Sequence, residues 1–408
     1  MSVLKRSSIH TINKLLQNFP CVVILGARQV GKSSILKQIF PKARIFDLED
    51  EVDFNRVNNS SKTFLESTPE PILIDEAQLC PNLFKALRVR IDQQRNLKGR
   101  FLLTGSSSPE LLKNISESLA GRVAIFELDM FSWSEAQQIP ESVFAKNITS
   151  LSKLKNLEQR FTQKQLLELM FYGQYPEPFL NKSKKDFVDI WMKNYIKTYI
   201  ERDIRALFPS LQLTTFKRFI SMLALSSGQV VNLSDFAKSL DVSQPTIKNY
   251  IQIAEGTFIW RNIGAYQGRN LTSRIIKAPK GHLRDSGLIN YFLKLKDIEQ
   301  MQSSPQFGRL WEVFIIEQLI REFNNANISN EYLYCRTQSK AEIDLIIEGD
   351  KGIIPIEIKS GRTTDPRKLI MLKDFINKEK CPYGILINNG DEVFMIDEKI
   401  IQIPAVFL

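Results

Sequence analysis

Apolar residues in the first part of the chain gather in short runs that amphipathic stretches separate. The runs lie at 21–25, 45–46, 72–74, 101–103 and 123–126. Between them, apolar residues recur at helical spacing, as in 5–18 and 33–40. Short, wholly apolar strands that alternate with helices are typical of a parallel sheet with helices on both faces. We therefore expect residues 1–135 to form an α/β domain.

The pattern changes after residue 135. Over 136–165 the apolar density falls and Ser, Asn, Lys and Gln become frequent, which is typical of a linker or of loosely packed helices. Over 165–225 apolar residues return at helical spacing, with Lys and Arg between aromatic residues, as in 191–200. We expect residues 136–225 to be a linker followed by a helical connector.

Residues 226–299 contain a pattern typical of a helix-turn-helix. Residues 233–240 and 244–251 have helical spacing, and the polar turn 241–243 separates them. Pro245 fits the first turn of the second helix, where its missing N–H costs nothing. We expect this segment to be a small, mainly helical domain.

The final segment, residues 300–408, has its own pattern of helix and strand. It begins with a helix and continues with apolar strands at 342–347 and 353–358. The whole chain of 408 residues is longer than one core usually serves, since a domain takes roughly 150 residues. We therefore expect an α/β domain, a helical region and a second, smaller α/β domain.

The composition excludes some classes of function and favours an anionic partner. The formal net charge is +10, and nucleic acid is the commonest anionic partner of a basic chain. The four cysteines are too far apart for a zinc or disulfide framework, and the chain has only two histidines. The sequence shows no bilayer-spanning segment and no signal sequence at its start. We expect a soluble cytoplasmic protein with no membrane partner.

The loop between the first expected strand and helix has the sequence of a Walker A motif. It runs Gly26-Ala27-Arg28-Gln29-Val30-Gly31-Lys32-Ser33-Ser34. Glycines permit the turns that point backbone N–H groups at phosphates, and the helix N-terminus adds positive charge. In such a loop the lysine neutralises phosphate charge, and the first serine binds Mg²⁺. Residues 26–34 therefore predict a site for ATP and Mg²⁺, with Lys32 and Ser33 in these roles.

The apolar run 72–74 ends in two acidic residues, as a Walker B strand does. Asp75 lies at the strand end, where a carboxylate can hold Mg²⁺ through water. Glu76 beside it can polarise the attacking water as a general base. The pair predicts that the protein hydrolyses ATP as well as binding it.

Hydroxyl and arginine side chains near the expected site have both functional and structural interpretations. Thr104, or alternatively Ser106, follows a buried strand, where a hydroxyl can sense the γ-phosphate. The same Thr-Gly-Ser sequence also suits an ordinary turn. Arg122 precedes the last strand of the domain and is either a surface arginine or an arginine finger for a neighbouring subunit. The second role predicts a homo-oligomer.

These motifs in combination resemble a known family. The two Walker elements, Leu-Thr-Gly-Ser-Ser-Ser at 103–108, Leu-Ala-Gly-Arg-Val at 119–123 and Tyr-Gly-Gln-Tyr-Pro-Glu at 172–177 are similar to those of bacterial and archaeal AAA+ ATPases that carry a C-terminal domain of unknown function. The resemblance covers nearly the whole chain. It implies an AAA+ core at 1–135, a winged-helix domain at 226–299 and a restriction-endonuclease-like core at 300–408.

A winged helix at 226–299 implies a surface for DNA. The exposed side of its recognition helix would carry Gln244, Thr246, Lys248 and Asn249. Phosphate contacts would come from Arg261, Arg269 and Arg274. The alternative role for such a domain is to pack against the ATPase without touching DNA.

The final segment carries acidic and basic residues in a pattern that resembles the PD-(D/E)XK nucleases. Glu312 lies on a helix, Asp344 lies in a strand, and Glu357 and Lys359 share one face of the next strand. In a nuclease, carboxylates hold Mg²⁺ at the scissile phosphate, and a lysine positions water and offsets charge. Glu-x-Lys also occurs on ordinary amphipathic strands, so a DNA-binding or structural role without cleavage stays open.

The sequence leaves three functions open. The first is an ATPase that acts on DNA, and the second is a nucleotide-dependent switch that binds a protein partner. The third is a nuclease gated by ATP. Salt-sensitive DNA binding favours the first or third, because phosphate contacts release counterions. Metal-dependent cutting that is lost in Lys359→Ala would single out the third.

Overall fold

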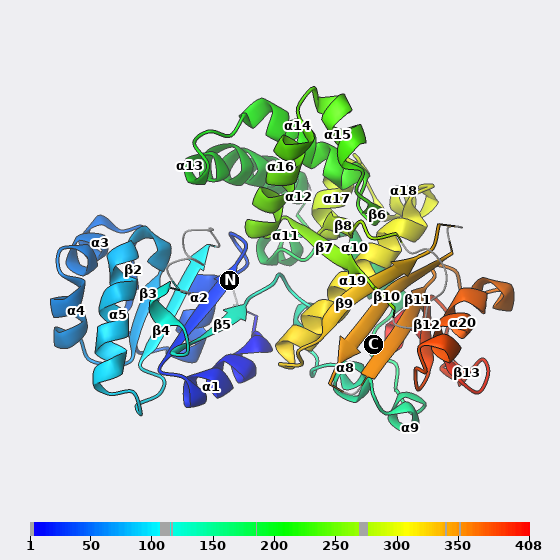
Figure 1. Ribbon diagram of the computed structural model, residues 1–408, viewed down its shortest axis with the longest axis horizontal. Helices are drawn as coiled ribbons and strands as arrows, with labels where there is room; N and C mark the ends of the chain where they lie inside the picture. Colours follow the sequence, from blue (N-terminus) through cyan, green and yellow to red (C-terminus); the bar gives the residue numbers. More distant parts are fainter. Residues whose placement is uncertain are drawn as a thin grey trace.

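Figure 1 shows the chain as a computed structural model, which describes residues 4–106, 115, 117–184, 186–268, 276–338, 341–350 and 352–408. A first sheet lies on the left, a second sheet lies on the right, and helices of the middle segment lie above them. The four cysteines are free and buried. Within the described residues, no helix has both the length and the apolar character needed to cross a bilayer.

The first sheet is parallel and has five strands in the order β2-β3-β4-β1-β5. The strands are β1 (Cys21–Gly26), β2 (Ile45–Asp47), β3 (Ile72–Asp75), β4 (Phe101–Ser106) and β5 (Val123–Glu127). Every residue of β1 and β3 is buried, because a parallel sheet is covered on both faces. This burial explains their wholly apolar runs. The predicted parallel α/β fold of the first domain is confirmed.

Helical crossovers bring all the strands of this sheet into one direction. The helices are α1 (Ser8–Asn18), α2 (Lys32–Ile39), α3 (Glu51–Asn58), α4 (Ser61–Ser67), η1 (Ala77–Leu79) and α5 (Pro81–Gln93). Parallel strands finish at the same edge of a sheet, which is where open α/β sheets bind their ligands. The loop after β1, the acidic residues at the end of β3 and the hydroxyl residues of β4 therefore meet there.

The segment after β5 packs against the end of the chain. It contains α7 (Trp133–Gln137), α8 (Val143–Asn147) and α9 (Leu151–Leu154). The Ser142 hydroxyl donates to the Leu408 carbonyl over 2.9 Å, and the Arg160 N–H donates to the Val406 carbonyl over 2.8 Å. The sequence predicts a linker or loosely packed helices at 136–165. Short helices form there, and these contacts hold the segment in place. Composition does not reveal them, because Ser142 and Leu408 are 266 positions apart.

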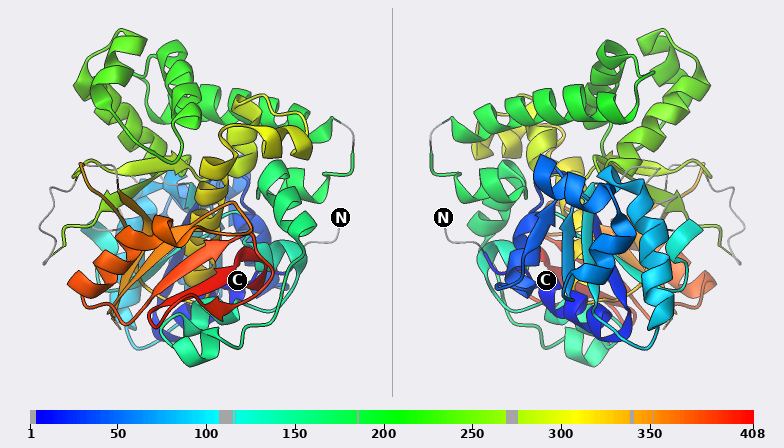
Figure 2. Two further views of the ribbon diagram at one scale, coloured as in Figure 1. Left: turned by 90° about the vertical axis from the view of Figure 1, so that its right-hand side faces the viewer. Right: turned by 90° about the vertical axis from the view of Figure 1, so that its left-hand side faces the viewer.

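The middle segment is helical, as its periodicity predicts. Its helices are α10 (Gln163–Tyr172), α11 (Pro176–Leu180), α12 (Phe187–Tyr195), η2 (Ile196–Asp203), α13 (Ile204–Leu207), α14 (Leu213–Leu225), α15 (Leu233–Leu240), α16 (Gln244–Gly256), α17 (Ser286–Phe292) and α18 (Ile298–Ser303). Rings of Phe216, Phe219, Phe236 and Tyr250 pack between α14, α15 and α16. The stretch from α12 to α13 runs above the first sheet in Figure 2.

The second sheet spans the middle and final segments. Its nine strands have the order β13-β14-β12-β11-β10-β9-β7-β8-β6. The strands are β6 (Gln229–Val230), β7 (Trp260–Ala265), β8 (Lys280–Leu283), β9 (Glu331–Arg336), β10 (Glu342–Gly349), β11 (Gly352–Ile358), β12 (Gly384–Asn388), β13 (Phe394–Met395) and β14 (Ile400–Pro404). Strand β7 joins β9 in parallel, Gly264 beside Leu333 and Ala265 beside Tyr334. The sequence predicts a boundary between 299 and 300, but this sheet crosses it.

A long buried helix, α19 (Phe307–Asn325), lies between the two sheets (Figure 1). Its Gln318 side chain accepts a hydrogen bond from the Trp133 N–H at 2.7 Å, and its Asn325 carbonyl accepts one from Thr11 at 2.7 Å. The remaining elements, on the C-terminal sheet, are η3 (Pro366–Leu369), α20 (Ile370–Lys378) and η4 (Ala405–Phe407). Helix α19 thus contacts both the first domain and the segment that follows it.

Candidate active site

The Walker A residues form a tight loop between β1 and α2. Gly31 has φ 98° at the start of α2, a left-handed conformation that glycine adopts readily. A Cβ on Gly26 would lie 2.3 Å from the Leu128 carbonyl oxygen, so only glycine fits at that position. No side chain caps the N-terminus of α2. The first N–H groups of this helix are therefore available to an anion.

Lys32 is a buried cation held inside the loop. Its side chain is 5% exposed, and Nζ donates to the carbonyl oxygens of Gly26 at 3.2 Å and Ala27 at 3.1 Å. Burial lowers its pKa, while the charges of Glu76 and Asp75 act in the opposite direction. An ammonium whose contacts in the loop are carbonyl oxygens is well placed to exchange them for phosphate oxygens.

Asp75 lies at the end of β3 and is 4% exposed. Its Oδ1 accepts hydrogen bonds from the Thr104 hydroxyl and, at 3.2 Å, from the Glu76 N–H. These donors hold the carboxylate in one orientation at the edge of the sheet. Such an orientation suits a Mg²⁺ ligand, because a metal site needs its carboxylate fixed.

Glu76 directly follows Asp75 and has a left-handed backbone, with φ 53°. Its carboxylate accepts hydrogen bonds from the Ser106 hydroxyl at 2.9 Å, from the Ser106 N–H at 3.3 Å and from Gln78. Burial raises the pKa of Glu76, but the charge of Lys32 and these hydrogen bonds outweigh it, so the pKa lies below its ordinary value. Glu76 is therefore an ionised, half-buried carboxylate beside the loop.

The structure separates the roles of the hydroxyl residues on β4. The sequence favours Thr104 as a sensor of the γ-phosphate, with Ser106 as the alternative. Thr104 is fully buried, and its hydroxyl donates to Asp75. Ser106 is half-buried and contacts Glu76. The Thr104 hydroxyl therefore contacts Asp75. The Ser106 hydroxyl contacts the carboxylate of Glu76, which is the candidate base.

Arg122 forms a two-pronged ion pair within its own chain. Its Nε lies 2.7 Å from Asp92 Oδ1, and its Nη2 lies 2.9 Å from Asp92 Oδ2. Hydrogen bonds from Arg122 hold the pKa of Asp92 below its usual range. A finger role in a neighbouring subunit would require Arg122 to leave Asp92.

The residues at this edge of the sheet fit a nucleoside triphosphate with Mg²⁺. The buried Lys32 ammonium and the uncapped start of α2 face the loop, and Ser33 and Ser34 lie exposed in the first turn. Ser33 and Asp75 are the side chains that would hold the metal, and backbone N–H groups of residues 26–34 would hold the phosphates. The structure brings together the residues predicted from both Walker elements.

In the middle segment, α16 presents the predicted polar residues to solvent. Gln244, Lys248 and Asn249 are exposed, and Thr246 is half-buried. Ser243 caps the helix by accepting a hydrogen bond from the Thr246 N–H at 3.3 Å. Three of the four side chains predicted to contact DNA are therefore accessible on one helix.

Arg261 is not available to a phosphate, which corrects the prediction made for it. Its side chain is 17% exposed, and its Nε lies 2.5 Å from Glu317 Oε1. Its Nη2 lies 3.4 Å from Asp129 Oδ2. Spacing along the chain cannot show this pairing, since Glu317 is 56 positions away. Arg269 and Arg274 lie outside the described residues.

The residues predicted for a nuclease-like site meet in the second sheet. Lys359, just after β11, places Nζ 3.3 Å from Asp344 Oδ2 and also pairs with Glu357. Asp344 Oδ2 accepts a hydrogen bond from the Ile358 N–H at 2.8 Å. Glu312 reaches the same cluster from α19, because its carboxylate lies within 4.8 Å of an oxygen of Asp344.

Two members of this cluster were not predicted from the sequence. Oxygen atoms of Glu312, Glu342 and Asp344 lie within 4.8 Å of one another, a spacing that a metal ion could bridge. The Lys280 ammonium, from β8, contacts Glu312 and lies 2.6 Å from Glu342 Oε1. Glu342 shares a strand face with Asp344, so alternation could have identified it. Lys280 comes from another segment, and no local pattern marks it.

The cluster is rich in carboxylates and largely buried. Burial raises the pKa of Glu312 to about 8, and the charge of Asp344 adds to the effect against the opposing charge of Lys280. Burial and the charge of Asp344 likewise raise the pKa of Glu357 to about 8, while Lys359 opposes them. Close carboxylates that disfavour each other's ionisation are suited to a divalent cation, which would hold them ionised.

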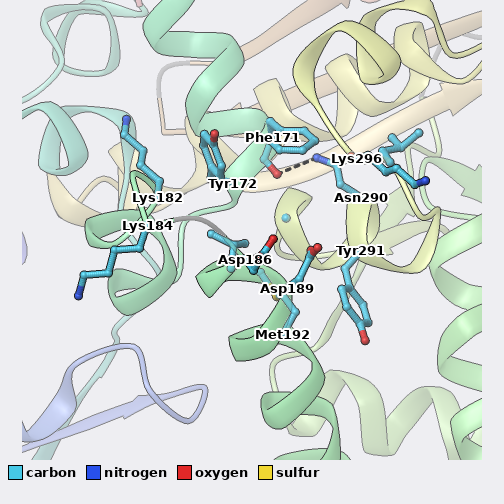
Figure 3. A pocket seen from close by; sticks show the side chains of 13 residues that line it. Phe171, Tyr172, Lys182, Lys184, Asp186, Asp189, Met192, Asn290, Tyr291 and Lys296 are labelled. Atoms are coloured by element: carbon cyan, nitrogen blue, oxygen red, sulfur yellow. Dashed lines mark hydrogen bonds between the residues drawn. The ribbon is translucent and has the colours of Figure 1, made fainter.

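A separate pocket of about 200 Å³ lies between α10, α12 and α17 (Figure 3). Lys182, Lys184, Asp186 and Asp189 line it, together with neighbouring aromatic residues. None of the residues predicted from the sequence for a site borders this pocket. The candidate chemistry therefore lies elsewhere, at the P-loop and at the carboxylate cluster.

Family models match the chain in three successive parts. Residues 18–137 match an AAA domain, residues 163–299 match a domain of unknown function (DUF8612), and residues 307–407 match a domain of unknown function (DUF4143). Two relatives are the uncharacterized proteins Rv2008c of Mycobacterium tuberculosis and Mb2031c of Mycobacterium bovis. Each is 29% identical over 407 residues, which is 99% of this chain and 84% of the relative.

Solved structures with a related arrangement include a Walker-type ATPase of Pyrococcus abyssi, with 15% identity and a TM-score of 0.42 over 71% of this chain and 96% of that one. Another is the ORC1 protein of Aeropyrum pernix in complex with DNA, with 11% identity and a TM-score of 0.31 over 72% of this chain and 93% of that one. Both scores are below 0.5, so the AAA match and the loop geometry carry the assignment. Residues 18–137 match an AAA domain and have an AAA-family ATPase fold.

Proposed function

We propose that this protein is a Mg²⁺-dependent ATPase that acts on DNA. One observation carries the hydrolytic part of the proposal, which is that a buried Lys32, a fixed Asp75 and a hydrogen-bonded Glu76 carboxylate lie at one edge of the first sheet. A protein that only bound ATP would need no second carboxylate held beside the loop. Glu76 in this position supports general-base chemistry.

Each residue around the P-loop, at this edge of the first sheet, has a part in the proposed reaction. Backbone N–H groups of 26–34 and the Lys32 ammonium bind the phosphates and offset their charge. Bound Mg²⁺, held by Ser33 and Asp75, would neutralise charge on the β and γ phosphates. Glu76 orients the attacking water and takes its proton, and Ser106 keeps the Glu76 carboxylate turned toward that water. Thr104 positions Asp75 through its hydroxyl.

Arg122 supplies the arginine finger in this proposal. In one chain it pairs with Asp92, and in a homo-oligomer it would leave Asp92 and stabilise the γ-phosphate of a neighbour. The proposal therefore includes an assembly in which ATP turnover per chain rises with protein concentration. A fully active monomer would rule the finger out.

The DNA part of the proposal rests on the middle segment. Helices α14 to α16, followed by strands β7 and β8, have the element order of a winged helix. The exposed Gln244, Lys248 and Asn249, with Thr246, form the proposed contact surface on α16. The net charge of +10 supports an anionic partner. The protein-partner switch is the competing function and predicts no effect of DNA on turnover.

An ATP-gated nuclease is a second candidate because of one specific observation. Lys359 contacts both Asp344 and Glu357, and Glu312 joins the same cluster, as metal-dependent cleavage of a phosphodiester requires. This candidate predicts cutting of DNA with Mg²⁺ that Lys359→Ala abolishes while ATP turnover stays unchanged. The absence of cutting by the wild type would leave the cluster in a binding or structural role.

The test of the main proposal is steady-state ATP turnover without DNA, with linear duplex and with a four-way junction. Lys32→Ala serves as the blank, because it removes the buried cation of the loop. We expect DNA to stimulate turnover, most strongly for one of the two structures. Turnover that no DNA changes would contradict the DNA role and favour the protein-partner switch.

A further inference from the structure

The P-loop makes a direct ionic contact with the helices above it. Arg28, the third residue of the loop, points its guanidinium at the Asp203 carboxylate, and the two form an ion pair. The Arg28 side chain is 32% exposed and that of Asp203 is 16% exposed. Arg28 Nη2 also lies 3.5 Å from Oε1 of Glu49, which belongs to the same domain. The Glu49 side chain is 59% exposed. The better-buried partner of Arg28 therefore belongs to the middle segment.

Asp203 ends η2, a π-helical stretch between α12 and α13. Residues 187–207 form one helical run with this wider stretch inside it, and the run passes above the first sheet (Figure 2). A π-helical stretch is less stable than the α-helix around it and is frequent at functional sites. A helix with such a stretch can change its local winding at lower cost than a regular one.

The same stretch also contacts the end of α16. Tyr199 is 3% exposed, and its hydroxyl donates to the Thr257 carbonyl oxygen at 2.8 Å. Thr257 is the residue that ends α16, and its own hydroxyl donates to the Ile253 carbonyl at 2.7 Å. Within η2, Asp203 therefore contacts the P-loop, and Tyr199 contacts the helix that carries the proposed DNA surface.

A row of aromatic rings packs this stretch together with the helix before it. Trp191 stacks on Tyr195 with centroids 5.0 Å apart, and Tyr195 lies 5.3 Å from Tyr199. The Tyr175 and Tyr195 hydroxyls are 2.6 Å apart, which fixes the row to α11 and the loop before it. The row thus connects η2 with α12 and α11, while Tyr199 also contacts the end of α16.

We propose that the Arg28–Asp203 ion pair is a nucleotide-sensitive latch that couples the P-loop to α16. Phosphate groups in the loop carry more negative charge than a carboxylate and compete with Asp203 for the guanidinium. When Arg28 turns to the phosphates, Asp203 is released, η2 rewinds, and the contact of Tyr199 with Thr257 shifts. The latch rests on the proposed binding of ATP but does not depend on DNA.

The test is hydrogen exchange of residues 244–257 with and without a slowly hydrolysed ATP analogue, on the full chain. In the wild type we expect nucleotide to change exchange in this region by about threefold or more. In Asp203→Asn and in Arg28→Gln the exchange should already resemble the nucleotide-bound state and should not respond further. Glu49→Gln is the matched control, because it removes a carboxylate near Arg28 without touching η2, and it should respond like the wild type.

Nucleotide affinity gives an independent readout. Asp203→Asn frees Arg28 from its competing carboxylate, so we expect the analogue to bind about fivefold more tightly than to the wild type. A thermal melt of each variant confirms folding. If Asp203→Asn keeps the wild-type exchange response, or binds the analogue no more tightly, the latch is overturned. If the wild type fails to bind nucleotide at all, the proposed ATPase is itself overturned, and the latch with it.

Discussion

At the scale of single residues, the backbone at the end of β3 fixes the direction of Glu76. Its left-handed conformation, with φ 53°, costs about 1–2 kcal/mol for a residue with a side chain. The cost is offset because Ser106 donates to the carboxylate twice, from its hydroxyl and from its N–H. The carboxylate of the proposed base is thereby oriented before any substrate arrives, which would lower the reorganisation needed in the proposed reaction.

Replacement of Ser106 by alanine tests this orientation. The variant loses the hydroxyl donor and keeps the N–H donor, so we expect turnover to fall about tenfold with nucleotide affinity changed by less than about twofold. Steady-state assays measure the turnover rate, and binding of an ATP analogue measures the nucleotide affinity. Ser67→Ala, at the end of α4, is the control. Lost affinity with intact turnover would show that Ser106 serves binding and not catalysis.

Replacement of Gly26 by alanine tests how closely the loop is packed. The new Cβ would lie 2.3 Å from the Leu128 carbonyl oxygen, so the backbone must shift. We expect a loss of about 1–3 kcal/mol in the free energy of unfolding, measured with urea. Gly256→Ala is the matched control, because no atom lies within 4 Å of its added Cβ. Equal stability of both variants would contradict the packing described for the loop.

At the scale of elements, α16 offers the most direct test of DNA contact. Lys248→Ala removes an exposed cation from the helix. We expect it to weaken DNA binding about equally for all sequences and to reduce the slope of affinity against salt by about 1. Fluorescence anisotropy of labelled duplex at several salt concentrations measures both. Lys62→Ala, on α4 of the first domain, should leave both unchanged. A salt slope unaffected by Lys248→Ala would remove α16 from the interface.

The elements of the first domain could be predicted because their signals are local in sequence. The apolar run 21–25, the glycine loop and the helix after it are consecutive, and parallel topology then brings Asp75 to the same edge. In the final segment, alternation predicts that Glu357 and Lys359 share a strand face, and the structure pairs their side chains, although Lys359 lies just after β11. Residues 136–165, predicted as a linker or loosely packed helices, illustrate the limit, because contacts with residues near the C-terminus hold a segment whose composition is polar.

Residues whose roles depend on distant partners could not be predicted. Lys280 joins the carboxylate cluster from β8, and Arg261 is paired with Glu317 and Asp129. Asp203 meets Arg28 across 175 positions of the chain. Each of these contacts depends on how separate elements pack together, which neither periodicity nor motif spacing reports. The site of the first domain was thus predictable, while its connections to the rest of the chain were not.

At the scale of the whole molecule, a buried ionic network joins the first domain to the rest. Asp129 lies just after β5. Its Oδ2 is 2.7 Å from Arg284 Nη2 and 3.4 Å from Arg261 Nη2. Arg261 in turn contacts Glu317 of α19, which also lies 2.8 Å from His282. Buried charges of this kind are costly to leave unpaired. The network therefore fixes how the first domain sits on α19.

Glu317→Gln tests the contribution of this network. Burial raises the pKa of Glu317, but Arg261, His282 and Arg321 outweigh it and place the pKa well below 4.5. A lowered carboxyl pKa stabilises the fold above the unfolded value and loses that effect as pH falls through the folded value. We expect Glu317→Gln to lose about 3–5 kcal/mol at pH 7, because it removes the nearest carboxylate from the largely buried Arg261 and Arg321.

The difference between wild type and Glu317→Gln should therefore shrink as pH falls below about 4.5. Urea unfolding of both proteins at pH 7 and at successively lower pH measures this difference in the free energy of unfolding. Glu299→Gln, exposed on α18, is the control and should change stability by less than about 0.5 kcal/mol. A difference that grew on acidification would contradict the charge assignment of the network.

In the proposed function, the residues around the P-loop hydrolyse ATP with Glu76 as the base. The most direct test measures single-turnover hydrolysis and nucleotide affinity in the wild type, Lys32→Ala and Glu76→Gln. We predict that Lys32→Ala loses affinity, whereas Glu76→Gln binds ATP normally and hydrolyses it at least about 100-fold more slowly. Hydrolysis by Glu76→Gln at the wild-type rate would contradict the assignment.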